Sequence, residues 1–298
     1  MYVINFIRGF FMALADSVPG VSGGTIAFIL GFYDNFIDSL NSLTSKSSSK
    51  EKKKESIIFL FKLGIGWIVG IVLSVIFLSS IFESHIYAIS SVFTGFIIFS
   101  IPLIIKAEKN NIKDKYANII FLIIGVIIVI AITYFNPSSA NEGINLAMSK
   151  LSIGTVIYVF ICGMIAISAM VLPGISGSTL LLIFGLYVPI ISSIKAVLKL
   201  DLQYVPILIV FALGIIIGIL TTIKIIKYSL VNYRSQMIYL ILGLMVGSIY
   251  AVFMGPTTLE APKAPMNLST FNFIYFILGG ALILGLDRFQ DILKKQNK

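Results

Sequence analysis

The chain has 298 residues, of which 58% are apolar and only 12% charged, and its mean hydropathy is +1.02. So little charge cannot cover a water-soluble domain, and the composition predicts an all-α protein that crosses a membrane several times. The net charge of +9 comes from lysines and arginines in short loops, which indicates membrane topology and attraction to anionic lipids and not a nucleic-acid-binding domain.

The first apolar segment, residues 2–40, is interrupted by the motif Pro19-Gly20-Val21-Ser22-Gly23-Gly24-Thr25. Proline ends the entering helix because it lacks an N–H and restricts the residue before it, and Gly20 permits a turn. Ser22 is a good N-cap for the exiting helix. The segment is therefore predicted to be a re-entrant helical hairpin, and not a cleaved signal peptide, because no small-residue cleavage pattern follows it.

Six later apolar runs are about 20 residues long and can cross as helices. They are residues 57–82, 86–105, 117–135, 204–223, 237–254 and 271–286. A second interrupted segment, residues 152–197, carries Pro173-Gly174-Ile175-Ser176-Gly177-Ser178-Thr179 and is the second predicted hairpin. The arms 22–40 and 152–172 are themselves long enough to cross, so ten crossings is an alternative to six spans and two hairpins.

The two motifs lie 154 residues apart and indicate an internal duplication. Residues 19–33 and 173–187 share eight identities in fifteen positions. At an offset of 148, Gly66 and Gly70 match Gly214 and Gly218, and Gly95 matches Gly243. The predicted organisation is a first repeat over residues 1–135, an outer linker at 136–151, a second repeat over 152–290 and a cytoplasmic tail at 291–298.

The distribution of positive charge predicts the topology of the repeats. Alternate loops carry sixteen Lys and Arg residues against four, and cytoplasmic loops are the ones that collect such residues. Both termini are therefore expected in the cytoplasm. Three spans separate equivalent points of the halves, so the repeats are predicted to have opposite, inverted topology.

Broken helices at membrane depth need protein or a water-filled cavity around their free backbone groups. We therefore expect the hairpin tips, Pro19, Gly20, Pro173 and Gly174, to face each other. Small residues at a helix N-terminus let an anion approach the free N–H groups there. Transporters of several folds bind substrate at such breaks. The predicted cradle is Ser22, Gly23, Gly24, Thr25, Ser176, Gly177, Ser178 and Thr179. In the alternative, the glycines serve close helix packing and the serines cap helices.

Two charged residues near the first motif are further candidates. Asp16 lies three residues before Pro19, whereas the second repeat has Met170 in that place. Asp16 could take up a coupling proton if removal from water favoured its neutral form, or it could accept hydrogen bonds from the loop backbone. Arg8 could pair with a phosphate or extend to the headgroups. No metal or cofactor is expected, and Cys162 is interpreted as a packing residue.

The segments Arg8-Gly9-Phe10, Ala15 to Thr25 and Leu30-Gly31-Phe32-Tyr33 resemble the opening signature of the bacterial polyisoprenyl-phosphate transporter family of the PopT type. Residues 172–178 with Gly185-Leu186-Tyr187 resemble its second signature, and the resemblance spans nearly the whole chain. It implies a flippase of the bacterial cytoplasmic membrane that returns undecaprenyl phosphate from the outer to the inner leaflet, and coupling to protons. The lipid phosphate would be the anion held between the tips.

An intramembrane polyprenyl-diphosphate phosphatase is the alternative, because such enzymes carry a similar Pro-Gly-x-Ser-Arg-Ser tip. Here Gly23 and Gly177 replace the arginine, whereas phosphoryl cleavage needs fixed cations. All glutamates fall in predicted loops, namely Glu51, Glu55, Glu83, Glu108, Glu142 and Glu260. The sequence therefore favours a transporter over an enzyme, and it shows no ring of polar residues of the kind expected in an anion channel.

Overall fold

The computed structural model describes residues 2–16, 22–45, 48–74, 79–134, 146–147, 151–177, 180–181, 184–258 and 262–296. Throughout these ranges the regular structure is helical, without a strand. Six helical stretches are long and apolar enough to cross a membrane: Lys50–Leu73, His85–Ala107, Tyr116–Tyr134, Ile153–Val171, Leu202–Asn232 and Arg234–Thr257. The prediction of an all-α, polytopic membrane protein is confirmed.

Five of these stretches overlap predicted spans, and the sixth, Ile153–Val171, was predicted as a hairpin arm. The predicted span 271–286 falls in α13 (Phe273–Gln296), whose apolar part Phe273–Gly285 is shorter. The predicted span 57–82 includes the end of α4 (Lys50–Leu73) and the start of α5 (Ser79–Ala107), and residues 75–78 between them lie outside the described residues. The helix α5 continues through the predicted loop at Glu83 to His85 with a kink at His85 (φ −124°, ψ 28°).

The first interrupted segment forms three helices, α1 (Tyr2–Asp16), α2 (Gly23–Ile29) and α3 (Tyr33–Thr44). Between α2 and α3, Gly31 has φ +63° and the Phe32 N–H donates to the Ala27 carbonyl over 3.0 Å, which is the hydrogen-bond pattern of a Schellman C-cap. With seven residues, α2 is only about 10 Å long and cannot cross the bilayer alone.

The second interrupted segment repeats this local structure. It contains α8 (Ile153–Val171), a turn at residues 172–176, and α10 (Tyr187–Leu198). Before α10, Gly185 has φ +64° and the Leu186 N–H donates to the Leu181 carbonyl over 2.9 Å. Both positions lie 154 residues after their counterparts Gly31 and Phe32, so the same turn precedes the equivalent helices α3 and α10.

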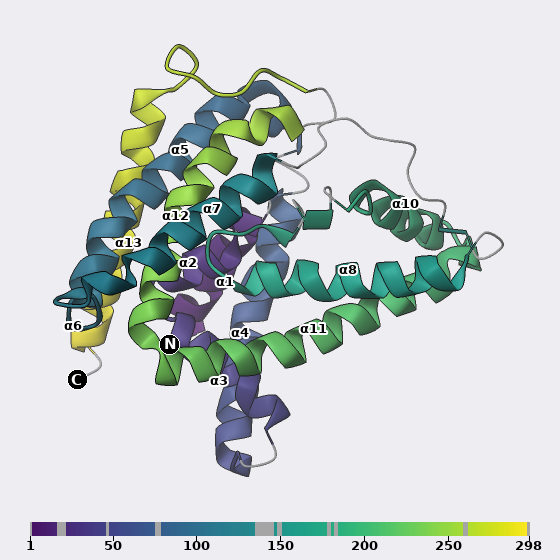
Figure 1. Cartoon of the computed structure of the whole chain (residues 1–298), viewed down its shortest axis with the longest axis horizontal. Coiled ribbons are helices and arrows are strands. Elements are labelled where there is room, and N and C mark those ends of the chain that lie inside the picture. Colours follow the sequence, from purple (N-terminus) through teal and green to yellow (C-terminus); the bar gives the residue numbers. More distant parts are fainter. Residues whose placement is uncertain are drawn as a thin grey trace.

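Glycines bring the helices of each half into close contact. A Cβ added at Gly66 in α4 would lie 2.0 Å from the Phe6 carbonyl oxygen in α1. The equivalent Gly214, in α11 (Val205–Asn232), would meet the Phe160 carbonyl oxygen in α8 at 2.3 Å. Only glycine permits this backbone approach. Figure 1 shows α8 and α11 running side by side.

Two further helix pairs join the halves. The helix α5 packs on α13, and α7 (Ile119–Tyr134) packs on α12 (Arg234–Met254), so each pair takes one helix from each half. A Cβ at Gly95 would lie 2.2 Å from the Phe276 carbonyl oxygen, and one at Gly243 would lie 2.1 Å from that of Leu122. These contacts recur at the same two sequence offsets, 148 for the glycine and 154 for its partner. Short helical pieces, α6 (Lys109–Ile112), η2 (Tyr116–Asn118), η4 (Leu202–Tyr204) and η5 (Gly255–Thr258), connect the long helices.

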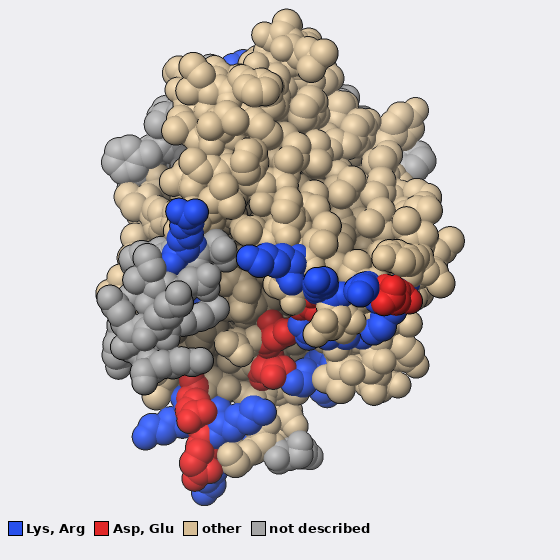
Figure 2. Space-filling view, turned by 90° about the vertical axis from the view of Figure 1, so that its left-hand side faces the viewer, with Lys and Arg blue, Asp and Glu red and all other residues tan. Residues whose placement is uncertain are grey.

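Charged side chains gather in a band at one end of the molecule, the end where α3 and the start of α4 protrude (Figures 1 and 2). On the visible face, the opposite part of the molecule carries almost no charge. At the charged end, Asp34 and Asp38 of α3 form ion pairs with Arg234 of α12 and Lys227 of α11, respectively, and Arg234 also pairs with Glu108. The first-half helix α3 is thereby tied to helices of the second half.

Candidate binding site between the two motifs

The described parts of the two motifs are in direct contact. The Ser22 hydroxyl donates to the Leu172 carbonyl over 3.2 Å, and the Gly174 N–H donates to Thr25 Oγ1 over 2.8 Å. Both hydroxyl-bearing side chains are almost fully buried. Each hydroxyl therefore satisfies a backbone group of the other half, which the unwound turn leaves without a helical partner.

Ser22 and Thr25 also act within their own half. The Ser22 side chain accepts a bond of 3.3 Å from the Thr25 N–H, which confirms Ser22 as the N-cap of α2. The buried Tyr33 donates its hydroxyl to the Val171 carbonyl over 3.2 Å and so adds a third bond between the halves. Sequence reasoning missed this role of Tyr33.

Gly174 holds the turn of the second motif against α12. Its φ is +90°, and a Cβ there would lie 2.6 Å from the Leu244 backbone carbonyl. A side chain would be excluded by both the backbone conformation and the contact. This explains why the second motif needs glycine directly after Pro173.

Asp16, at the end of α1, accepts two hydrogen bonds. Its Oδ1 accepts from the Gly23 N–H over 2.7 Å, and its Oδ2 accepts from the indole N–H of Trp67 over 2.9 Å. Asp16 thus accepts a hydrogen bond from the motif backbone, as in the second alternative, and its role as a proton site stays a prediction. Trp67 was not predicted, although it is the only tryptophan in the chain and lies between Gly66 and Gly70, where α4 packs against α1.

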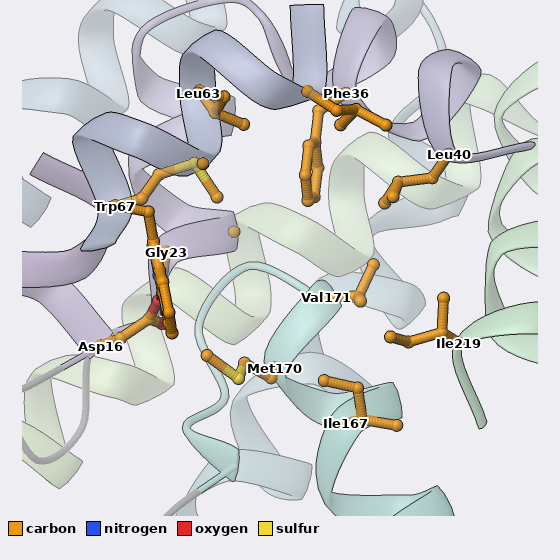
Figure 3. A pocket seen from close by; sticks show the side chains of 14 residues that line it. Asp16, Gly23, Phe36, Leu40, Leu63, Trp67, Ile167, Met170, Val171 and Ile219 are labelled. Carbon is orange, nitrogen blue, oxygen red and sulfur yellow. Dashed lines mark hydrogen bonds between the residues drawn. The ribbon is translucent and has the colours of Figure 1, made fainter. Parts of the chain in front are cut away.

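A cavity of about 250 Å³ lies against this carboxylate. Figure 3 shows Asp16, Gly23 and Trp67 on one wall, Leu63 and Phe36 on the next, and Met170, Ile167, Val171 and Ile219 opposite. Apart from Asp16, its lining is apolar or glycine, and it includes Gly24. We call this space the Gly23 cavity.

A second cavity of about 210 Å³ also borders Asp16, and we call it the Gly177 cavity. It is lined by Asp16, Ala166, Ile167, Met170, Ser176, Gly177, Leu181, Phe211 and Ile215. The residues common to both cavities are Asp16, Ile167 and Met170. Asp16 is the only charged residue among the described residues that line either space.

The predicted cradle is thus divided between several roles. Gly23 and Gly24 line the Gly23 cavity, and Ser176 and Gly177 line the Gly177 cavity. A Cβ at Gly24 would lie 2.7 Å from the Val171 carbonyl oxygen, and one at Gly177 would lie 2.8 Å from that of Ala166, so these two glycines also serve close packing. Pro19, Gly20, Ser178 and Thr179 lie outside the described residues.

Arg8 lies away from both cavities. Its guanidinium stands 4.7 Å from the ring centroid of Phe32, and Nη1 donates to Asn5 Oδ1 over 3.1 Å. It is not among the described lining residues. Pairing of Arg8 with a phosphate stays a prediction that this arrangement does not favour.

Taken together, apolar spanning helices, two interrupted segments that meet inside the helical body and two cavities at their junction define a polytopic membrane protein of the transporter class. The chain belongs to the family described as VCA0040-like, undecaprenyl phosphate translocase-like, which matches residues 12–270. The prediction of a transporter, in preference to a phosphatase, is confirmed by this membership.

Two relatives are named polyprenyl-phosphate transporters. The protein of Staphylococcus aureus is 35% identical over 291 residues, which cover 96% of each chain. The protein of Vibrio cholerae is 33% identical over 222 residues, 72% of this chain, and the match spans 65% of its own length. No solved structure matches the chain.

Proposed function

We propose that this chain carries undecaprenyl phosphate across the bacterial cytoplasmic membrane, from the outer to the inner leaflet, with the phosphate held where the two motifs meet. The observation that carries this proposal is the contact between Ser22 and Thr25 of the first motif and Leu172 and Gly174 of the second, with a cavity on each side. Family membership supports the substrate, because the relatives are named as polyprenyl-phosphate transporters.

The two halves are proposed to be inverted repeats, each a re-entrant hairpin followed by three transmembrane helices, with both termini in the cytoplasm. The recurrence of glycine contacts at fixed offsets and the shared turn at Gly31 and Gly185 support a structural duplication. The band of charge at the α3 end supports its assignment to the cytoplasmic side, because cytoplasmic surfaces collect Lys and Arg.

Asp16 is proposed to take up the coupling proton. A lipid phosphate entering the Gly23 cavity would meet a carboxylate, and two like charges in an apolar space repel each other. A protonated Asp16 carries no charge and can donate a hydrogen bond to a phosphate oxygen. Binding of the lipid and of the proton would then favour each other.

The test is a flux assay with the purified chain in liposomes and a polyprenyl phosphate labelled at its tail. Accessible label in each leaflet is followed by a membrane-impermeant reductant, starting with lipid in one leaflet only. Gly23→Leu should abolish flux, because its side chain would fill the space beside Asp16. Gly154→Leu is the matched control, since only Ser152 Oγ, at 3.6 Å, lies near a Cβ at Gly154. Equal flux by both variants would refute the proposed site.

The proton role is tested by the pH profile of the same flux. Wild-type flux should fall as the pH rises, because the fraction of protonated Asp16 decreases, and Asp16→Asn should give a flat profile. An unchanged profile in Asp16→Asn would exclude this role. Release of inorganic phosphate from a polyprenyl diphosphate by the wild type would instead support the phosphatase alternative.

A further inference from the structure

The Gly23 and Gly177 cavities are built from equivalent positions of the two halves. Met12, Asp16 and Gly23 line the first cavity, and residues 154 positions later, Ala166, Met170 and Gly177, line the second. At the offset of 148, Leu63 and Trp67 of the first cavity correspond to Phe211 and Ile215 of the second. The same two offsets relate the glycine contacts, so the match follows the packing of the whole helices.

Two equivalent residues line both cavities. Asp16 and Met170 occupy the same position in the two halves, and each of them lines both cavities. Ile167 also lines both cavities. A group that occupies either cavity is therefore in reach of both the Asp16 and the Met170 side chains.

The cavities lie at different positions along α11. Along α11, Ile219 of the Gly23 cavity is eight residues from the ion-paired Lys227, and Phe211 of the Gly177 cavity is sixteen residues from it. With a rise of 1.5 Å per residue, these separations are about 12 Å and about 24 Å. Along α11, the Gly23 cavity is therefore nearer the ion-paired Lys227 than the Gly177 cavity is.

Resting on the proposed transport of a polyprenyl phosphate, we propose that the Gly177 cavity is a second binding site for the phosphate-bearing end of this lipid. The apolar linings suit a branched isoprenoid, and Ser176 adds a polar group to the second site. Both volumes are below those of pockets that enclose a whole drug-sized ligand, so each site takes only one end of the chain while the tail stays in lipid.

Filling the second cavity alone tests this assignment. Ala166→Phe places a ring in the Gly177 cavity, whereas Ile165→Phe, at the neighbouring residue of α8, places it on the exposed surface, because Ile165 is 44% exposed. Flux of labelled polyprenyl phosphate should fall about tenfold or more in Ala166→Phe and stay within about twofold of wild type in Ile165→Phe. Wild-type flux by Ala166→Phe would overturn the proposal.

The single tryptophan reports binding at the first cavity in the same variants. Titration with farnesyl phosphate should change Trp67 fluorescence in a saturable way in wild type and in Ala166→Phe, with midpoints within about threefold of each other. This retained response shows that Ala166→Phe is folded and that the first site is separate. Loss of the response together with flux would mean one continuous site and would overturn the proposal.

Moving the tryptophan probes the second cavity directly. In the double variant Trp67→Phe with Ile215→Trp, farnesyl phosphate should give a saturable change in fluorescence, and farnesol, which lacks the phosphate, should give a much weaker one. A silent probe in a protein whose wild-type form transports lipid would refute the second site but leave the proposed function standing. Absence of flux in the wild type itself would instead refute the proposed function.

Discussion

The Gly23 and Gly177 cavities have equivalent frames but different polar groups. Asp16 lines both, yet the two groups that hold its carboxylate, the Gly23 N–H and the Trp67 indole, belong to the first cavity. At the equivalent positions the second half has Met170 and Ile215. The two halves thus place equivalent residues around both cavities, while the hydrogen-bond donors that hold the Asp16 carboxylate belong to the first cavity only.

The largest expected effect tests this difference by placing leucine at the two equivalent positions, Asp16 and Met170. Asp16→Leu should lower flux about a hundredfold, the scale seen when one polar group is removed from a preorganised site. Met170→Leu should change flux by no more than about tenfold, because swaps between Met and Leu conserve volume. Proteoliposome flux measures both. Similar losses at the two positions would show that flux depends on the shape of these two side chains and not on the charge of Asp16.

A smaller loss is expected when the support of the carboxylate is removed. Trp67→Phe keeps the ring but deletes the N–H that donates to Asp16, and a hydrogen bond to a charged group contributes about 1.5–3 kcal/mol. At low pH, where Asp16 is protonated in both proteins, flux should fall about tenfold because the carboxyl group loses an orienting partner, and the pH of half-maximal flux should rise because the charged form loses a donor. Ile215→Phe, the equivalent change in the second cavity, should leave the pH profile unshifted. A shift in both would contradict the asymmetry.

The contact between the motifs predicts an effect on stability. Thr25→Val removes the acceptor of the Gly174 N–H and leaves a buried donor unsatisfied, which should lower the free energy of unfolding by about 1–3 kcal/mol. Thr221→Val is the control, because the exposed Thr221 hydroxyl bonds only carbonyls of its own helix. Denaturant unfolding in detergent measures both variants. Equal destabilisation of the two variants would mean that the hydrogen bond between the motifs stabilises the protein no more than a hydrogen bond within one helix.

The smallest expected effect compares α3 with α10, its counterpart in the second half. The ion pair of Asp38 with Lys227 ties α3 to the second half, whereas the sequence of α10 contains no acidic residue. Both partners are partly exposed, so Lys227→Gln should lower stability by about 0.2–1 kcal/mol, less at high salt. Thermal unfolding at two salt concentrations measures this. Exchange of the charges, with Asp38→Lys and Lys227→Asp, should restore most of the loss.

Several features were predictable from the sequence because they depend on local chemistry. The composition requires a membrane-spanning helical protein, the motif gives the Ser22 N-cap, and the repeated glycines mark positions where helices pack closely. Gly31 and Gly185 were noted only as identities of the repeat. Both have positive φ values, which suit glycine. At Gly31 this turn separates α2 from α3, so the predicted arm 22–40 is two helices.

Other features depend on how distant segments meet. Hydropathy alone did not predict that α5 continues through Glu83 to His85 with a kink at His85, since these polar residues interrupt the apolar run. The hydrogen bond of Trp67 to Asp16, 51 residues apart, and the bond of Tyr33 to Val171 follow only from the packing of α4 on α1 and of α2 on α8.

The amino-acid sequence by itself indicated that this protein spans a membrane, that its two halves resemble each other, and which residue types break its helices. Each of these depends on composition or on neighbours along the chain. The tertiary structure decided which backbone groups the motif hydroxyls satisfy, that the cavities form a pair divided by Asp16 and Met170, and that Arg8 lies outside them. Side chains reach such partners only after helices from both halves have packed, and no local pattern records that packing.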